Sequence, residues 1–268
     1  MRKIKVQCPA KINLSLKVTG KRPDGFHNIE SIMQTINLYD YITISAEPDD
    51  GLNIHLSGNS SEIPYDESNL VYKAAKLFFA QLEFSDEYKV SINIEKNIPV
   101  AAGLAGGSTD AAGTLFGLNI LFDEPLSRHD IHTLCAKLGS DLNFCLEGGT
   151  KMTRGRGEIL EPVPFIEQKL SLIKPLNFGI SAKEAYTKFS KKTADNVSGR
   201  DKFVNDLEWA VIDDYKILQS VKAKYPASIM SGSGPTYYII DGKFEDTKGF
   251  WGKSDLKTTS CGVTVVEE

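Results

Sequence analysis

The sequence lacks the features that mark membrane, secreted and nucleic-acid-binding proteins. No stretch of the chain reaches the roughly 20 consecutive apolar residues that span a bilayer. Its start, MRKIKVQCPAKINLSLK, alternates charged with apolar residues and is therefore neither a signal peptide nor an anchor. The 31 lysines and arginines do not outnumber the 35 aspartates and glutamates, which leaves no basic surplus for nucleic acid. We expect a cytoplasmic protein that binds neither membranes nor nucleic acids.

The four cysteines show no CxxC spacing, which predicts free thiols rather than a zinc site or a disulfide framework. Hydrophobic residues make up 41% and charged residues 25% of the chain, as in ordinary globular proteins. The length of 268 residues allows two modest domains, which we place at residues 1–153 and 154–268. The oligomeric state stays open between a monomer and a weak dimer.

Short alternating runs predict a β-rich first half. From Lys11 to Val18 apolar and polar residues alternate, the pattern of a half-buried strand, so that Lys11 and Asn13 share one face. Similar runs cover residues 42–46, 54–56 and 90–94. Apolar stripes predict helices over 69–82 and 127–139, the second opened by a Ser127–Asp130 capping box and closed by Gly139.

The second half follows a different order. We expect a strand over 170–174, helices over 182–189 and 205–224, and two strands over 228–231 and 236–240 joined by a glycine turn. A helix over 245–251 and a strand over 262–266 would complete the series. This β-α-β-β-α-β order predicts a ferredoxin-like split unit.

The glycine-rich stretch from Pro99 to Thr109 carries the chemistry. It follows a strand-like run, passes through three glycines and leads into a helix. Glycines let the backbone approach an anion, and the N–H groups and partial positive charge of a helix N-terminus attract phosphate. The stretch is not a Walker loop, because GxxxxGK[ST] is absent. By itself it also leaves open a tight turn capped by Ser108 or Thr109, as the less favoured alternative.

Further segments surround this loop in the sequence. They read PAKINLSLKVTGKRPDGFHNIESIMQTINLYDYITI, LGSDLNFCLEGGTKMTRGRGE, NDLEWAV and MSGSGPTYYII. With the loop, they resemble the GHMP kinases, the superfamily of galactokinase and of homoserine, mevalonate and phosphomevalonate kinases. The DGFH segment is typical of the branch that acts on a cytidine diphosphate-linked methylerythritol.

The resemblance covers nearly the whole chain and implies an α+β fold of two domains. A β-rich α/β N-terminal domain would bind ATP, a ferredoxin-like domain would follow it, and the active site would lie in the cleft between them. The implied reaction transfers the γ-phosphate of ATP to the 2-hydroxyl of the cytidylyl substrate, in the non-mevalonate isoprenoid pathway. Mg²⁺ would arrive with ATP, and Ser108 and Thr109 are candidates for its protein ligand.

The resemblance also assigns roles to single residues. By analogy, Asp141 accepts the alcohol proton, while Lys11 keeps Asp141 ionised and orients the hydroxyl or the transferring phosphoryl group. The residues alone leave blander interpretations open. Asp141 could be the N-cap of the next short helix, and Lys11 could be a solvated lysine at a strand edge.

The substrate's nucleotide half would lie at the DGFH segment. Phe26 and His27 match the cytosine-recognition residues, and Tyr186 falls where an aromatic ring usually closes the stack. His27 can present a donor and an acceptor to the pyrimidine, and Asn13 can reach the methylerythritol hydroxyls. Core packing is the alternative for Phe26 and Tyr186.

ATP would be held by the whole loop, with Asn69 and Lys96 near the adenine. For these last two, a helix N-cap and a surface lysine are the alternatives. The loop residues expected to bind ATP are Pro99, Val100, Ala101, Ala102, Gly103, Leu104, Ala105, Gly106, Gly107, Ser108 and Thr109.

The chain departs from the family pattern in places. The usual loop reads GAGLGGGSSDAA, whereas Ala101, Ala105 and Thr109 here replace two glycines and a serine. An alanine at 105 must avoid positive φ or accept strain. LGADVPFF becomes LGSDLNFC, and Ala182 stands where a threonine is usual, which removes one substrate hydrogen bond.

Three other functions compete with this one. A mevalonate- or homoserine-type kinase would not need the DGFH segment. A non-catalytic nucleotide sensor of the same fold would not need both Lys11 and Asp141. A purely structural protein would need neither the glycine-rich loop nor the cleft motifs.

Overall fold

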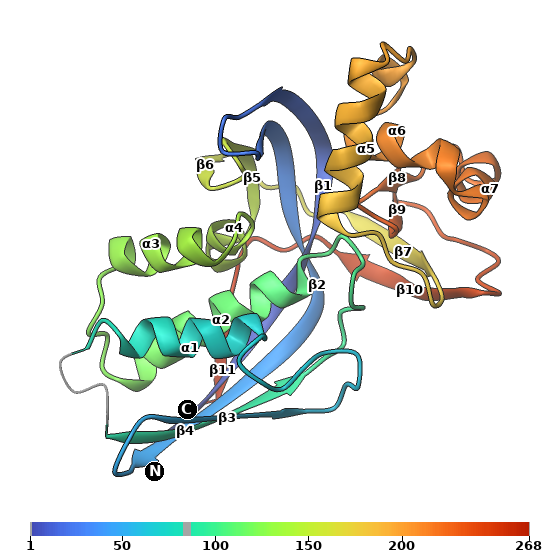
Figure 1. Cartoon of the computed structure of the whole chain (residues 1–268). Helices are drawn as coiled ribbons and strands as arrows, with labels where there is room; N and C mark the ends of the chain where they lie inside the picture. Colours follow the sequence, from blue (N-terminus) through green and yellow to red (C-terminus); the bar gives the residue numbers. More distant parts are fainter. Residues whose placement is uncertain (1, 83–86, 268) are drawn as a thin grey trace.

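Two β-sheets with their helices form the molecule in the computed structural model, which describes residues 2–82 and 87–267 (Figure 1). The first sheet has the order β11-β1-β2-β4-β3, and β5 and β6 extend it from β2. The alternating runs predicted in the first half all lie in its strands. These are β1 (Arg2–Lys21), β2 (His27–Pro48), β3 (Asn53–Gly58), β4 (Tyr88–Glu95), β5 (Thr150–Arg154), β6 (Ile159–Pro162) and β11 (Thr264–Glu267).

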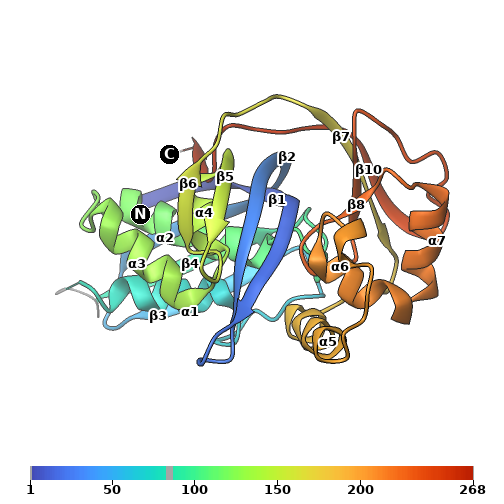
Figure 2. The same ribbon diagram turned by 90° about the horizontal axis from the view of Figure 1, so that it is seen from above.

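The hairpin of β1 and β2 extends from the first sheet to a second group of helices, which lies within residues 182–224. Its register shifts between Pro9 and Ala10, and such a bulge bends the strand that contains it. On one side of the bulge β2 pairs with β4, and on the other side it pairs with β5. The part of the hairpin between this bulge and the turn includes Lys11 of β1. It stands between the two groups of helices (Figure 2).

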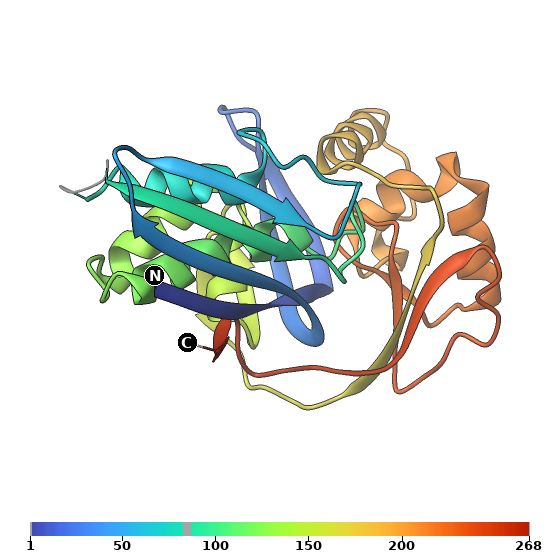
Figure 3. The same cartoon turned by 90° about the horizontal axis from the view of Figure 1, so that it is seen from below.

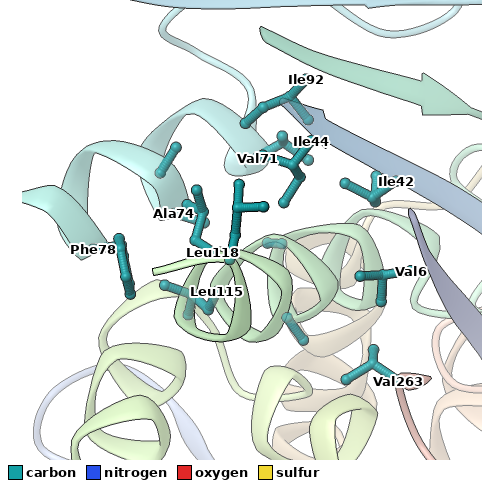
Figure 4. Close-up of a cluster of buried hydrophobic side chains, with 14 of the residues drawn as sticks. Val6, Ile42, Ile44, Val71, Ala74, Phe78, Ile92, Leu115, Leu118 and Val263 are labelled. Carbon is teal, nitrogen blue, oxygen red and sulfur yellow. The ribbon is translucent and has the colours of Figure 1, made fainter. Parts of the chain in front are cut away.

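Four helices cover one face of the first sheet, and Figure 3 shows the sheet in front of them. Apolar side chains from the sheet meet those of the helices in one buried cluster (Figure 4). Gly113 and Gly117 permit this contact, because a Cβ at Gly113 would lie 2.3 Å from Cys8 Sγ. The helices are α1 (Leu70–Phe79), α2 (Gly106–Leu121), α3 (Arg128–Leu138) and α4 (Leu142–Glu147).

This cluster anchors the start of α2. Leu115 and Leu118 of α2 are fully buried, and each such side chain contributes about 1.5–3 kcal/mol. At α3, the predicted capping box of Ser127 and Asp130 is present, and Gly139 follows the helix. The glycine-rich loop therefore joins two firmly packed elements, β4 and α2.

The second sheet has the order β10-β7-β9-β8, all antiparallel. Its helices lie along one face (Figure 1). The predicted strand over 170–174 and the predicted helix over 182–189 fall within its elements, and the strand predicted over 236–240 begins one residue before β9. These are β7 (Lys169–Pro175), α5 (Ala182–Ala194), α6 (Asp206–Val211), α7 (Lys216–Lys224), β8 (Ile229–Met230), β9 (Tyr237–Ile240) and β10 (Phe250–Lys257).

Three predictions for this half were wrong. The helix expected over 205–224 is broken, because Tyr215 has extended dihedrals between a 3₁₀ turn (Ile212–Asp214) and α7. Residues 245–251 do not form a helix: they lead into β10, and Gly249 just before it has a φ of +84°. The strand expected over 262–266 is β11, which pairs with β1 in the first sheet rather than with the second. Across the described ranges, no helix is both long and apolar enough to cross a membrane.

Candidate active site

The glycine-rich loop presents an uncapped helix N-terminus. The N-cap of α2 is Ala105, which has no side chain able to cap, and the helix begins at Gly106. Ser108 and Thr109 therefore lie inside the first turn of the helix. Neither residue caps the helix, so the alternative of a tight turn capped by one of them is wrong. The first N–H groups of a helix have no partner within it, and here they stay available to an anion.

The loop's backbone is left-handed at three positions. Ala101, Gly103 and Ala105 have φ of 50°, 74° and 60°. At Gly103, a Cβ would come within 2.2 Å of the Ser231 carbonyl oxygen, so only glycine can be accommodated. At Ala101 and Ala105 the chain accepts the strain, which costs roughly 1–2 kcal/mol per residue for an L-amino acid.

Replacing Ala105 by glycine should therefore stabilise the protein. We expect Ala105→Gly to raise the free energy of unfolding by about 1 kcal/mol, because relief of the left-handed strain exceeds the entropy that glycine adds to the unfolded chain. Urea denaturation measures this. The matched control is Ala102→Gly, at a buried alanine of ordinary φ, which should destabilise the protein. Equal destabilisation by both changes would contradict the strain.

A cavity of about 740 Å³ opens beside the loop, between the first sheet's hairpin and the second group of helices. It gathers predicted residues from five separate stretches of the chain. Lining it are Lys11 and Asn13 of β1, Phe26 and His27 at the hairpin tip, Gly103, Ala105 and Ser108 of the loop and α2, Asp141 before α4, and Tyr186 of α5.

Lys11 and Asp141 meet in this cavity. Their Nζ and Oδ2 atoms are 3.8 Å apart, with the Lys11 side chain only 4% exposed and that of Asp141 30% exposed. Lys11 is thus not a solvated lysine at a strand edge. Asp141 does occupy the N-cap position of α4, but its side chain makes no capping hydrogen bond, so the carboxylate is available to a ligand.

Lys11 is held in place by two acceptors. Its ammonium donates to Asn13 Oδ1 at 2.7 Å and to the Gly103 carbonyl oxygen at 3.0 Å. Asn13 in turn donates to Ser31 Oγ at 2.8 Å. Lys11 is therefore hydrogen-bonded to the glycine-rich loop itself, and its position depends on the backbone of that loop.

The SGSG turn completes this arrangement and was not predicted as part of the site. Ser231 Oγ donates to the same Gly103 carbonyl at 2.9 Å. Asn205, which is fully buried, donates to the carbonyls of Met230 and Gly232 at 2.7 and 2.8 Å. The signal in the sequence was the pair of segments NDLEWAV and MSGSGPTYYII: Asn205 of the first bonds to the turn in the second, and Ser231 of the second bonds to the loop.

The aromatic residues gather at the other end of the cavity. Tyr186 stacks on His27 with ring centroids 5.0 Å apart and planes inclined by 14°, while the Arg156 guanidinium lies 5.0 Å from the Phe26 centroid. Phe26 is 52% exposed, which excludes core packing for it. Burial, with a contribution from Lys21, lowers the pKa of His27, so that its ring is neutral at pH 7.

Asn69 and Lys96 lie beside the loop but not in the cavity lining. Asn69 N-caps α1, with Oδ1 accepting the Val71 N–H. Lys96 is not a surface lysine, since its side chain is only 5% exposed and its ammonium contacts Asp40 and Asp110. Lys96 and Leu70, the residue after Asn69, adjoin the first turn of α2: a Cβ at Gly106 would lie 3.0 Å from Lys96 Nζ, and one at Gly107 would lie 3.9 Å from Leu70 Cδ1.

Of the two hydroxyl residues expected to ligate Mg²⁺, one reaches the cavity. Ser108 lines the cavity, whereas Thr109 is fully buried. Within residues 2–82 and 87–267, no group of three or more histidine, cysteine, aspartate or glutamate side chains could hold a metal by itself. The cavity thus combines an anion cradle, a lysine–aspartate pair and an aromatic slot.

Comparison with known proteins agrees with this geometry. Residues 69–149 match the GHMP kinases N terminal domain. A 4-diphosphocytidyl-2-C-methyl-D-erythritol kinase of Clostridium perfringens is 38% identical over 96% of this chain and 97% of its own length. The enzyme of the same description from Syntrophomonas wolfei is 39% identical over 88% of each chain.

Solved structures share the fold. A crystal structure of 4-(cytidine 5'-diphospho)-2C-methyl-D-erythritol kinase matches with a TM-score of 0.73 and 24% identity, covering 96% of this chain and all of that one. Homoserine kinase from Cytophaga hutchinsonii matches with a TM-score of 0.70 and 18% identity, covering 99% and 98% of the two chains.

Proposed function

Since the chain belongs to the GHMP kinases and, within them, to the 4-diphosphocytidyl-2-C-methyl-D-erythritol kinases, we propose that it transfers the γ-phosphate of ATP to the 2-hydroxyl of that cytidylyl alcohol. The reaction belongs to the non-mevalonate isoprenoid pathway. The observation that carries the proposal is the Lys11–Asp141 pair, 3.8 Å apart at the point where the glycine-rich loop borders the cavity.

In this mechanism Asp141 accepts the proton of the 2-hydroxyl as its oxygen attacks the γ-phosphorus. The bond from that phosphorus to the β,γ-bridging oxygen breaks, and ADP leaves. Lys11 holds its ammonium 3.8 Å from Asp141 Oδ2 and neutralises charge on the transferring group. Its two hydrogen bonds, to Asn13 and Gly103, fix the direction in which the ammonium points.

The triphosphate would lie along residues 99–109, against the N–H groups at the start of α2. We place the adenine against the neighbouring segments that carry Asn69 and Lys96, because both adjoin Gly106 and Gly107. Mg²⁺ would neutralise part of the phosphate charge when it binds with ATP. The hydroxyl of Ser108, which lines the cavity, would hold the ion.

The cytidine would occupy the aromatic end of the cavity. There, Phe26 and Tyr186 offer ring faces, and His27, whose Nε2 bonds to Ser190 Oγ at 3.0 Å, offers Nδ1 to the base. Asn13 would contact the methylerythritol. Ala182 also lines the cavity, and the threonine usual in the family would place a hydroxyl there.

Removing the ring of Tyr186 should weaken the binding of the cytidylyl substrate but not that of ATP. Stacking of a base on an aromatic side chain is worth about 1–3 kcal/mol, so Tyr186→Ala should raise the KM for this substrate by about 5- to 150-fold. Steady-state kinetics measures both KM values. Tyr186→Phe, which keeps the ring, is the control and should stay near the wild type. An equal rise in the KM for ATP would place the stack elsewhere.

We also propose that the chain folds into two domains and acts in the cytoplasm. We assign an ATP-binding N-terminal domain, residues 1–153, and a ferredoxin-like C-terminal domain, residues 154–268. The second sheet's order, β10-β7-β9-β8, supports the ferredoxin-like assignment, and the first sheet also takes in β6 and β11. The cysteines Cys8, Cys135, Cys145 and Cys261 are free thiols, which is consistent with the cytoplasm.

A substrate panel tests the function. Purified protein is given MgATP with the cytidylyl alcohol, mevalonate, homoserine or galactose, and ADP is measured. We expect ADP only with the cytidylyl alcohol. ADP with another alcohol instead would overturn the substrate assignment. Nucleotide binding without turnover on any of them would indicate a sensor.

A further inference from the structure

Directly beneath the glycine-rich loop lies a buried ionic cluster that the mechanism above does not use. Asp40 of β2, Lys96 after β4 and Asp110 of α2 come together there, with side chains 0%, 5% and 4% exposed. The Lys96 ammonium contacts Asp40 Oδ2 and lies 2.7 Å from Asp110 Oδ2. Charged side chains are almost never this deeply buried without a specific partner.

The cluster closes the base of the loop. At the loop's start, Asp40 Oδ1 accepts the N–H groups of Asn97 and Ile98, at 2.6 and 2.8 Å. At the loop's end, Asp110 lies in the second turn of α2. Since Lys96 contacts both carboxylates, a single ammonium joins the two ends of the segment that would carry the triphosphate.

The loop also rests on the cluster. A Cβ added at Gly106 would lie 3.0 Å from Lys96 Nζ and 3.2 Å from the Ile98 side chain. Gly106 is the first residue of α2, whose N–H groups face the anion site. The Lys96 ammonium therefore lies close to the first residue of α2.

The charges suit a position under phosphates. Burial, opposed by Lys96 and aided by Asp40, raises the pKa of Asp110 to about 8. Burial alone would lower the pKa of Lys96, but Asp110 and Asp40 outweigh it and raise that pKa. The ammonium of Lys96 thus offsets the negative charge of the two acidic side chains beneath the proposed ATP site.

We propose that Asp40, Lys96 and Asp110 are positioning residues that fix the triphosphate loop for ATP binding. They act through the backbone of residues 97–106 and not by side-chain contact with the nucleotide. The inference rests on the proposed use of ATP by this loop. It predicts that damage to the cluster weakens ATP binding selectively, while the cytidylyl end of the cavity, formed by other elements, is unaffected.

The sharpest variant is Asp110→Ala. It removes the bond between α2 and Lys96 but leaves Lys96 paired with Asp40. It also deletes an oxygen, Asp110 Oδ1, that is buried without a hydrogen-bond partner among the described residues, so the fold should tolerate the change. We expect the dissociation constant for MgATP and the KM for ATP to rise about tenfold. The KM for the cytidylyl alcohol should stay within twofold. Asp110→Asn, which keeps an oxygen for Lys96, should retain most of the wild-type affinity for MgATP.

The matched control is Thr114→Val. Thr114 lies one turn further along α2 and is fully buried, but its hydroxyl bonds only to the Asp110 backbone carbonyl. This variant should bind ATP like the wild type. Lys96→Met, which removes the central ammonium, should weaken ATP binding more than Asp110→Ala. If it does not fold, the Asp110 pair still decides the question.

Two results would overturn the proposal. One is a folded Asp110→Ala protein whose MgATP dissociation constant stays within twofold of the wild type. The other is a parallel rise in both KM values, which would mean general damage. Calorimetric titration with MgATP separates this test from the reaction: a wild type that binds ATP without phosphorylating the cytidylyl alcohol refutes the proposed substrate, while the variants still test the cluster.

Discussion

Asp141→Asn should lower kcat by about 10²–10⁴-fold, the usual contribution of a general base. The amide keeps the size of the carboxylate but does not accept the hydroxyl proton. Because Asp141 lies beside the glycine-rich loop and not in it, the KM for ATP should change by less than about threefold. Release of ADP in the presence of the cytidylyl alcohol measures kcat, and titration with MgATP measures binding.

The structure offers a matched control for this change. Asp255 is also an aspartate, but it is exposed, pairs with Lys243 at 3.0 Å and lies on β10, away from the cavity. It has a φ of 60°, which asparagine adopts readily, so Asp255→Asn should keep full activity. Near-normal turnover by Asp141→Asn would remove the base from the mechanism. In that case, positioning and charge neutralisation alone would carry the reaction.

Lys11→Met should lower kcat by about 10²–10³-fold, as loss of one preorganised electrostatic contact does. Methionine is of similar length but carries no charge. It neither attracts the Asp141 carboxylate nor neutralises charge on the transferring phosphoryl group. It also leaves Asn13 Oδ1 and the Gly103 carbonyl without their lysine donor, so the KM for ATP should rise as well. Turnover at saturating substrates separates the two effects.

Lys3→Met is the control on the same strand, because Lys3 is exposed and lies outside the cavity lining. It should leave both kcat and the KM for ATP unchanged. Circular dichroism must show that Lys11→Met is folded before its rate is interpreted. A folded Lys11→Met with wild-type kcat would contradict the electrostatic role, and a change confined to the KM for ATP would make Lys11 a binding residue only.

Local signals were sufficient where short-range physics decides the structure. The capping box at Ser127 and the stop at Gly139 were recognisable because caps are formed by residues three or four apart. The strand face shared by Lys11 and Asn13 followed from alternation. By contrast, the 205–224 pattern looked like one helix, since periodicity does not reveal that Tyr215 is extended.

Long-range pairings could not be read in the same way. β11 has the pattern of any short strand, and its partner β1 lies at the opposite end of the chain. The sequence assigned no role to Asp40 or Asp110, and it placed Lys96 near the adenine, with a surface lysine as the alternative. The role of Ser231 in holding the Gly103 carbonyl likewise depends on two segments far apart in sequence.

The sequence alone determined that this chain has a glycine-rich stretch before a helix, and its motifs identified the GHMP kinases. These are properties of contiguous residues, whose backbone preferences and periodicity are local. Only the tertiary structure decided that Ala101 and Ala105 adopt left-handed backbone, that Lys11 is buried 3.8 Å from Asp141, and that a buried ion cluster closes the loop. Burial and pairing arise from packing between distant segments, and no local pattern specifies them.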